Sequence, residues 1–189
     1  MADTVRDLAT LQALLADNAP AQDISAQDVR DFLVSVYCDY IKVSDVKAAN
    51  TAGGGFTSGA WRTRDINTED SDGGSHCAIA ANQITLQPGT YVCNMSAPAL
   101  LVDQHKIRLQ NITDGVTELL GTSEYADSTG LAVDQTRSLL FGRFILAAAK
   151  VLEVQHRCVT TRAGNGFGVA ANLGVNEVYT VAEFWREPD

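Results

Sequence analysis

Three histidines offer acid–base or metal chemistry, but the sequence gives none of them the neighbours that such chemistry needs. His76, His105 and His156 lie far apart along the chain. None belongs to an HExxH zinc motif, and none follows the GxSxG turn of a serine hydrolase. We therefore expect no catalytic histidine, and we predict that the chain is not an enzyme.

Acidic and glycine-rich turns suggest two other kinds of site. Glu69, Asp70 and Asp72 precede a Gly-Gly pair and offer carboxylates of the kind that calcium binds, but the later Glu of an EF-hand loop is missing. The segment 164–168 (GNGFG) offers main-chain amides, yet it is not GxGxxG, and no parallel βαβ unit surrounds it. We expect a solvated turn and a surface loop, with no metal and no cofactor.

Composition and charge exclude further classes. The net charge of −9 opposes binding to nucleic acid, because that affinity comes from Lys and Arg. No apolar run is long enough for membrane insertion, and residues 1–20 lack the pattern of a secretory signal. The cysteines are scattered without a CxxC pair, which favours buried free thiols and assembly in a reducing cytoplasm. They are Cys38, Cys77, Cys93 and Cys158.

The elements that carry these residues begin with a helical arm, predicted over residues 1–43. Apolar residues recur at three- and four-residue spacing in two segments, which is typical of short amphipathic helices. The first stripe is Val5, Leu8, Leu11 and Leu15. The second stripe, which we predict to anchor the chain to a partner, is Val29, Phe32, Leu33, Val36 and Tyr40.

A change of composition marks the boundary of a second region. Residues 44–59 contain Asn50, Thr51 and the run Gly53–Gly55, which predicts a flexible Gly-rich connector. From residue 60 to residue 189, short strand-like runs alternate with turn signals. The spacing predicts about eight antiparallel strands in a mainly β sandwich or barrel.

Two of these strands are apolar on both faces. Between residues 139 and 146, one face carries Leu139, Phe141 and Ile145, and the other carries Leu140, Phe144 and Leu146. In the last strand, Val178 and Phe184 share one face, while Tyr179, Val181 and Trp185 share the other. A sandwich covers only one face of each sheet, so the second face needs another cover. A neighbouring copy is the simplest cover; the alternatives are the helical arm folding back, or a bulge that shifts the strand parity.

Several segments resemble a known family. ITLQPGTY at residues 84–91 and VYTVAEFW at residues 178–185, with the strand order between them, are similar to C1q/TNF-like jelly-roll domains of bacteriophage fibre and virion-surface proteins. The stretch from residue 108 to residue 158 resembles such phage domains in particular, and the similarity covers roughly residues 56–186. The segments 6–10 and 23–32 resemble leader segments of phage structural proteins.

The resemblance implies an antiparallel jelly-roll sandwich that forms a homotrimer, with the sheet of the final strand lining the three-fold axis. The residues that we predict for the trimer interface are Tyr91, Phe141, Tyr179, Val181 and Trp185.

The function expected from these features is structural. We expect a phage virion protein, assembled in the host cytoplasm and placed on the virion surface, that joins other capsid or tail proteins through its arm. In one version it is a fibre that contacts a host-surface glycan, through Trp61 or polar turns on the β scaffold. In another it is a trimeric cement or decoration protein that stabilises the head. A third hypothesis is a non-viral carbohydrate- or calcium-binding module.

Overall fold

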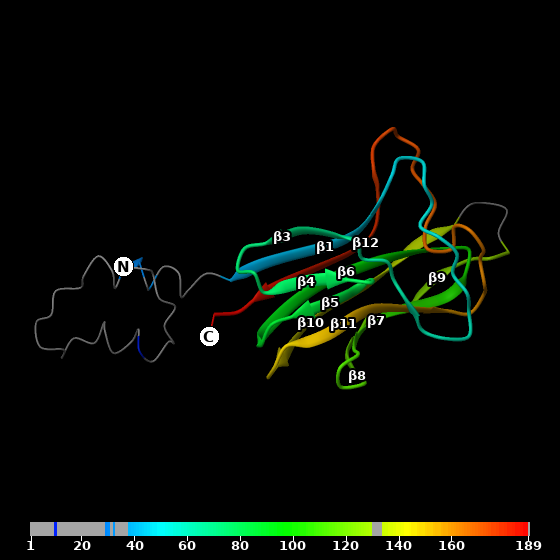
Figure 1. Cartoon of the computed structure of the whole chain (residues 1–189). Coiled ribbons are helices and arrows are strands. Elements are labelled where there is room, and N and C mark those ends of the chain that lie inside the picture. Colours follow the sequence, from blue (N-terminus) through cyan, green and yellow to red (C-terminus); the bar gives the residue numbers. More distant parts are fainter. Residues whose placement is uncertain (1–9, 11–28, 31, 33–37, 130–133, 189) are drawn as a thin grey trace, which may run out of the picture.

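The computed structural model describes residues 10, 29–30, 32, 38–129 and 134–188. The four described residues before position 38 are helical. Between residues 39 and 188, the described residues form twelve strands, which make two antiparallel sheets packed face to face (Figure 1). The predicted antiparallel β sandwich is therefore confirmed.

The first sheet has five strands in the order β10-β6-β12-β1-β3, and both the first and the last strand of the chain lie inside it. Its strands are β1 (Asp39–Lys47), β3 (Thr68–Asp72), β6 (Gly89–Leu100), β10 (Gln135–Leu146) and β12 (Glu177–Arg186).

The second sheet follows the order β4-β5-β11-β7-β8, with two short strands, β2 and β9, added beside β11 and β7. Its strands are β2 (Arg62–Thr63), β4 (Cys77–Ala80), β5 (Gln83–Leu86), β7 (Asp103–Asn111), β8 (Val116–Leu120), β9 (Glu124–Ala126) and β11 (Lys150–Cys158).

Alternation of apolar residues along the strands builds the core between the sheets. Every second residue of a strand points to the same face, so β7 buries Ile107 and Leu109 while Arg108 points outward. β11 buries Leu152 and Val154 in the same way. The outward residues of these two strands are polar, as the sequence predicts, but two of them, Gln110 and Glu153, are themselves buried.

The start of the β-domain differs from the predicted boundary. β1 begins at Asp39, inside the predicted arm, and ends at Lys47, inside the predicted connector. Ile41 and Val43 are fully buried in the core, so this segment is a strand that belongs to the sandwich. The apolar residues from Val29 to Tyr40 fit helical spacing, so the sequence pattern alone does not indicate that a strand begins at Asp39.

The predicted connector is also wrong as a flexible linker. The loop after β1 is bonded to the loop before β12: the amide of Gly53 donates to the carbonyl of Gly168 at 2.9 Å, and the amide of Phe167 donates to the carbonyl of Gly54 at 2.9 Å. Phe56 is fully buried. A Cβ on Gly53 would lie 2.8 Å from the carbonyl oxygen of Phe167, so this glycine permits close packing of two main chains.

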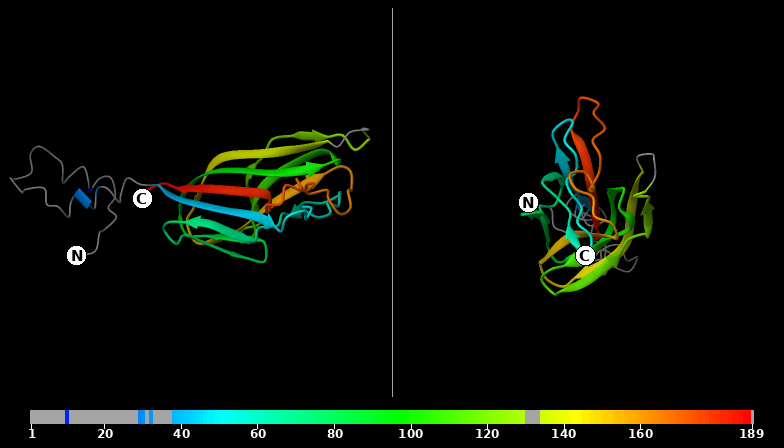
Figure 2. Two further views of the ribbon diagram at one scale, coloured as in Figure 1. Left: turned by 90° about the horizontal axis from the view of Figure 1, so that it is seen from above. Right: turned by 90° about the vertical axis from the view of Figure 1, so that its right-hand side faces the viewer.

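Both ends of the β-domain lie at the same end of the sandwich. Asp39 at the start of β1 pairs with Arg186 at the end of β12. Figures 1 and 2 show the chain entering β1 and leaving β12 side by side. At the other ends of β1 and β12, the loop that follows β1 and the loop that precedes β12 project together to one side of the sandwich. In the part of the chain that the structure describes, no helix has the length and apolar character needed to span a membrane.

Candidate functional site

The outward face of β10 is the most apolar exposed surface of the first sheet. Leu140, Phe144 and Leu146 point into the core, so the residues between them point outward. The outward side chains of Phe141 and Ile145 remain 62% and 64% exposed. The sequence prediction of two apolar faces on this strand is confirmed.

Neighbouring strands extend this surface across the sheet. Val92 on β6, which is 40% exposed, lies between β10 and β12, and it pairs with Arg143 on one side and with Trp185 on the other. Val181 on β12 lies on the same outward face and pairs with Ser96. We call the outward side chains of β10, β6 and β12 the apolar face; its apolar members are Leu139, Phe141, Ile145, Val92, Val181 and Trp185.

The polar groups on and beside the apolar face are paired within the chain. Glu183 accepts hydrogen bonds from the Tyr40 hydroxyl at 2.6 Å and from the Asn94 amide at 3.0 Å. Desolvation, followed by the hydrogen bond to Glu183, raises the pKa of Tyr40 to about 12, so this phenol stays a donor. Arg143 makes two 2.8 Å bonds to the carboxylate of Glu187. Paired polar groups lose less on desolvation than free ones, so they suit a surface that another molecule covers.

The structure divides the predicted interface residues into two groups. Phe141, Val181 and Trp185 lie on the apolar face, but Tyr91 is fully buried and stacks on Phe144 at a ring distance of 5.6 Å. Tyr91 is therefore a core residue, and its prediction as an interface residue needs correction. Val92 and Ile145 also lie on the apolar face, although neither is among the predicted interface residues. Alternation with Phe141 is the signal that places Ile145 there.

Tyr179 is the other predicted interface residue with little free surface. Only 3% of it is exposed, because the loops beside β1 and β12 cover it. Its hydroxyl donates to the carbonyl of Thr51 at 2.7 Å, and a Cβ added at Gly168 would lie 2.5 Å from its ring. Tyr179 therefore packs against these loops within the single chain.

The predicted anchor residues do not all belong to one helical element. Val29 and Phe32 are helical and are 48% and 40% exposed. Leu33 and Val36 lie outside the described residues. Tyr40 is in β1 opposite Trp185, with a ring distance of 5.4 Å, so it belongs to the β-domain and not to a helical stripe.

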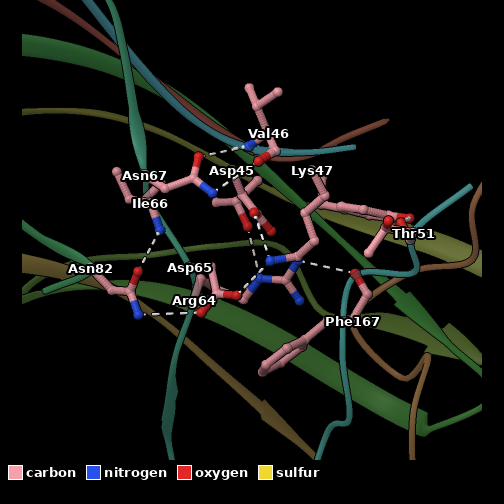
Figure 3. A network of polar contacts seen from close by, with 12 residues as sticks. Asp45, Val46, Lys47, Thr51, Arg64, Asp65, Ile66, Asn67, Asn82 and Phe167 are labelled. Atoms are coloured by element: carbon pink, nitrogen blue, oxygen red, sulfur yellow. Dashed lines mark hydrogen bonds and ion pairs between the residues drawn. The ribbon is translucent and has the colours of Figure 1, made fainter. Parts of the chain in front are cut away.

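A buried arginine fixes the loop before β12 against the sandwich. Arg64 is fully buried and donates to Thr180 Oγ1 at 2.8 Å, to the carbonyl of Pro98 at 3.2 Å and to the carbonyl of Phe167 at 3.0 Å. Its guanidinium also lies 4.0 Å from the centre of the Phe167 ring. Figure 3 shows this side chain reaching the Phe167 main chain, with Asp45 beside it. Burial lowers the pKa of Arg64 to about 9, which leaves the guanidinium charged at neutral pH.

Two of the three histidines meet in the core. His105 Nδ1 lies 3.0 Å from His156 Nε2, and His105 Nε2 lies 2.7 Å from Thr136 Oγ1. Burial lowers the pKa of His105 to about 4 and holds the pKa of His156 well below its ordinary value. Both imidazoles are therefore neutral at pH 7. His76 lies elsewhere, 2.9 Å from Asp39.

The other candidate groups have structural partners. Asp70 accepts from the Ser44 hydroxyl, and Asp72 accepts from the amides of His76 and Cys77. Across residues 38–129 and 134–188, no group of three or more His, Cys, Asp or Glu side chains is arranged to hold a metal ion. All four thiols are free, and Cys38 is exposed.

Comparison with known proteins identifies the fold. No protein-family model matches the sequence, and no curated protein matches it. A crystal structure of murine APRIL at pH 5.0 aligns over 79% of this chain and 98% of that chain, with 8% identity and a TM-score of 0.52. The globular domain of zebrafish complement 1qA aligns over 80% of this chain and 96% of that chain, with 13% identity and a TM-score of 0.46. Together with the two antiparallel sheets described above, the match to APRIL shows that the chain has a C1q/TNF-like jelly-roll fold.

Proposed function

We propose that this protein is a homotrimeric structural protein of a phage virion surface, attached to the particle by its N-terminal arm. One observation carries the proposal: the apolar face leaves Phe141 and Ile145 more than 60% exposed in the single chain. Apolar surface of this kind, rimmed by polar groups, marks interaction sites on other proteins.

A second and a third copy are the proposed cover for this face. Interface cores are rich in aromatic residues, and the apolar face carries two of them, Phe141 and Trp185. The resemblance stated above implies the same sheet, because that family turns the sheet of the final strand toward the three-fold axis. A closed ring of three copies would bury the face on every protomer.

Features of the N-terminal arm support the proposal that this protein is attached to a particle. Val29 and Phe32 are exposed apolar side chains in helical conformation, and the arm leads into β1 at the end of the sandwich where β12 also finishes. Attachment from this end would leave the long loops of the other end directed outward. That geometry favours a fibre or decoration that contacts the host surface; a cement protein of the head is the alternative. A virion-surface location with assembly in the host cytoplasm belongs to the same proposal.

Oligomeric mass tests the proposal at the apolar face. We expect light scattering after gel filtration to give three times the chain mass of 20.2 kDa. Phe141→Asp places a charge at the centre of the face and should give a folded monomer, with an unchanged far-ultraviolet circular dichroism spectrum.

Leu120→Asp is the matched control, because Leu120 is 61% exposed on β8 of the other sheet. This variant should remain a trimer. A wild-type monomer at micromolar concentration would contradict the trimer, and a trimeric Phe141→Asp protein would move the interface away from this face.

A further inference from the structure

A hollow lies beside the second sheet, away from the apolar face. It has a volume of about 370 Å³, and it forms where the segment before β2 meets β7, β11 and the chain entering β9. Its wall includes Trp61, Gln104, Lys106, Glu124 and Arg157. A volume of this size lies at the lower end of the range for small-molecule sites, so it suits a ligand of one ring.

Two cations face each other at this hollow. Lys106 on β7 and Arg157 on β11 are direct cross-strand partners in the register of the second sheet. Like charges in this position repel each other and are expected to destabilise a sheet. Within residues 38–129 and 134–188, neither side chain has a hydrogen bond or an ion pair. An anion placed between them would remove the repulsion.

The ring of Trp61 also lines the hollow, and Arg108 holds it in place. The guanidinium of Arg108 lies 4.4 Å from the centre of the Trp61 ring. Arg108 is itself fixed, because it donates to Gln155 Oε1 at 3.0 and 2.7 Å and to Thr117 Oγ1 at 3.0 Å. Trp61 therefore forms an apolar wall whose position does not have to be ordered on binding.

We propose that this hollow binds a sugar that carries a single carboxylate, of the uronic or sialic acid class. The carboxylate would lie between Lys106 and Arg157, where the guanidinium can donate two parallel hydrogen bonds to it. The C–H face of the sugar ring would pack on Trp61, and hydroxyls would bond to Gln104 and Glu124. The inference deepens the proposed host contact and rests on it for its biological meaning.

The charges around the hollow select this class over other anions. Lys106, Arg157 and Glu124 together carry one net positive charge at neutral pH. One negative charge on the ligand balances them. A polysulfated chain or a nucleic acid would bring many negative charges to a protein of net charge −9 and would be repelled.

Ligand-observed NMR on the full-length protein tests the proposal. The probes are glucuronate and N-acetylneuraminate, with glucose as the neutral match and inorganic sulfate as the anion without a ring. We expect saturable binding of the two acidic sugars in the millimolar range or tighter, and no saturable binding of glucose. Lys106→Gln and Arg157→Gln should each weaken binding about tenfold, because each removes a charge-assisted hydrogen bond.

Lys150→Gln is the matched control, since it removes the same charge from β11 but its ammonium pairs with Asp114 at 2.7 Å, outside the hollow. This variant should bind like the wild type. Trp61→Phe keeps an aromatic wall and should retain binding, and Trp61→Ala should lose it.

Three results would overturn the site: no saturable binding of either acidic sugar, equal binding of glucose, or sulfate binding as tightly as the acidic sugars. Oligomeric mass is measured on the same samples. A trimer that binds no acidic sugar overturns this inference and leaves the proposed assembly intact, whereas a monomer that binds one overturns the assembly and leaves the site intact.

Discussion

The His105–His156 pair has a definite arrangement of protons. His156 Nδ1 is buried and has no hydrogen-bond partner among the described residues. A buried N–H without an acceptor costs more than a bare lone pair, so the proton of His156 belongs on Nε2. It then donates to His105 Nδ1, His105 Nε2–H donates to Thr136 Oγ1, and Thr136 donates to the carbonyl of Tyr125 at 3.3 Å. The chain of donors thus joins β11, β7, β10 and β9.

This pair should make folding sensitive to mild acid. An unfolded histidine has a pKa near 6.5, whereas the pKa of folded His105 is about 4. Between these values the unfolded state binds more protons, so the free energy of unfolding falls as the pH falls. The loss is about 3 kcal/mol for His105 at pH 4, and His156 adds to it because its pKa is lowered in the same direction. Urea unfolding at pH 7, 6, 5 and 4 measures this fall in the free energy of unfolding.

Two variants separate the contribution of the histidines from that of the carboxylates. One carries both His105→Gln and His156→Gln, and the other carries His105→Gln alone. We expect a shallower dependence on pH between 6.5 and 4. The carboxylates of Asp103, Glu153 and Glu177 have lowered pKa values and act at lower pH, because unfolded carboxylates titrate near pH 4. An unchanged slope in both variants would show that the histidines do not control acid sensitivity.

At the scale of elements, β1 determines how much of the N-terminal region can be removed. β1 lies between β12 and β3, so its loss would expose the edge of β12 and open the core at Ile41 and Val43. We expect deletion of residues 1–37 to change the free energy of unfolding by about 1 kcal/mol or less. Deletion of residues 1–47 should abolish the cooperative transition. Thermal unfolding followed by circular dichroism distinguishes the two.

Equal stability of the two truncated proteins would contradict the position of β1. If the protein without residues 1–47 still folded, the β-domain would begin near residue 60, as the composition of the sequence predicts.

Sequence patterns predicted some elements well, for a physical reason. Period-two alternation is set by strand geometry alone, so the faces of β7, β10 and β11 follow directly from their residues. β1 could not be predicted as a strand, because buried Ser44 and Asp45 interrupt its apolar alternation. The packing of the loops after β1 and before β12 could not be predicted, because a Gly-rich loop that is closely packed has the same composition as a flexible Gly-rich linker.

The candidate sites were less accessible to sequence reasoning. Phe141 and Trp185 follow from alternation, but Tyr91 was misplaced because the sequence does not tell which face of β6 meets the core. The hollow depends on register: Lys106 and Arg157 are neighbours only because β7 and β11 pair as they do. Fifty residues separate them along the chain, and no local pattern encodes that pairing.

At the scale of the whole molecule, the position of the chain ends predicts how the proposed trimer is attached. Asp39 and Arg186 lie together at one end, so three protomers arranged around a common axis would send their arms out on the same side. Deleting residues 1–37 should therefore leave a trimer by light scattering but remove the protein from particles. Immunoblotting of purified virions measures the second effect, with the full-length chain as the control.

Normal incorporation of the shortened protein would show that the arm is not the anchor. Loss of the trimer in the same protein would instead mean that residues 1–37 hold the copies together.

The place of β12 has a consequence for how each molecule is made. β12 pairs with β6 on one side and with β1 on the other. A nascent chain leaving the ribosome carries β1 and β6 long before Glu177–Arg186 has been synthesised. During that interval both strands present open edges, which pair readily with other chains. We therefore expect β1 and β6 to keep these edges open until β12 inserts between them, so that the last strand to be synthesised closes the sheet.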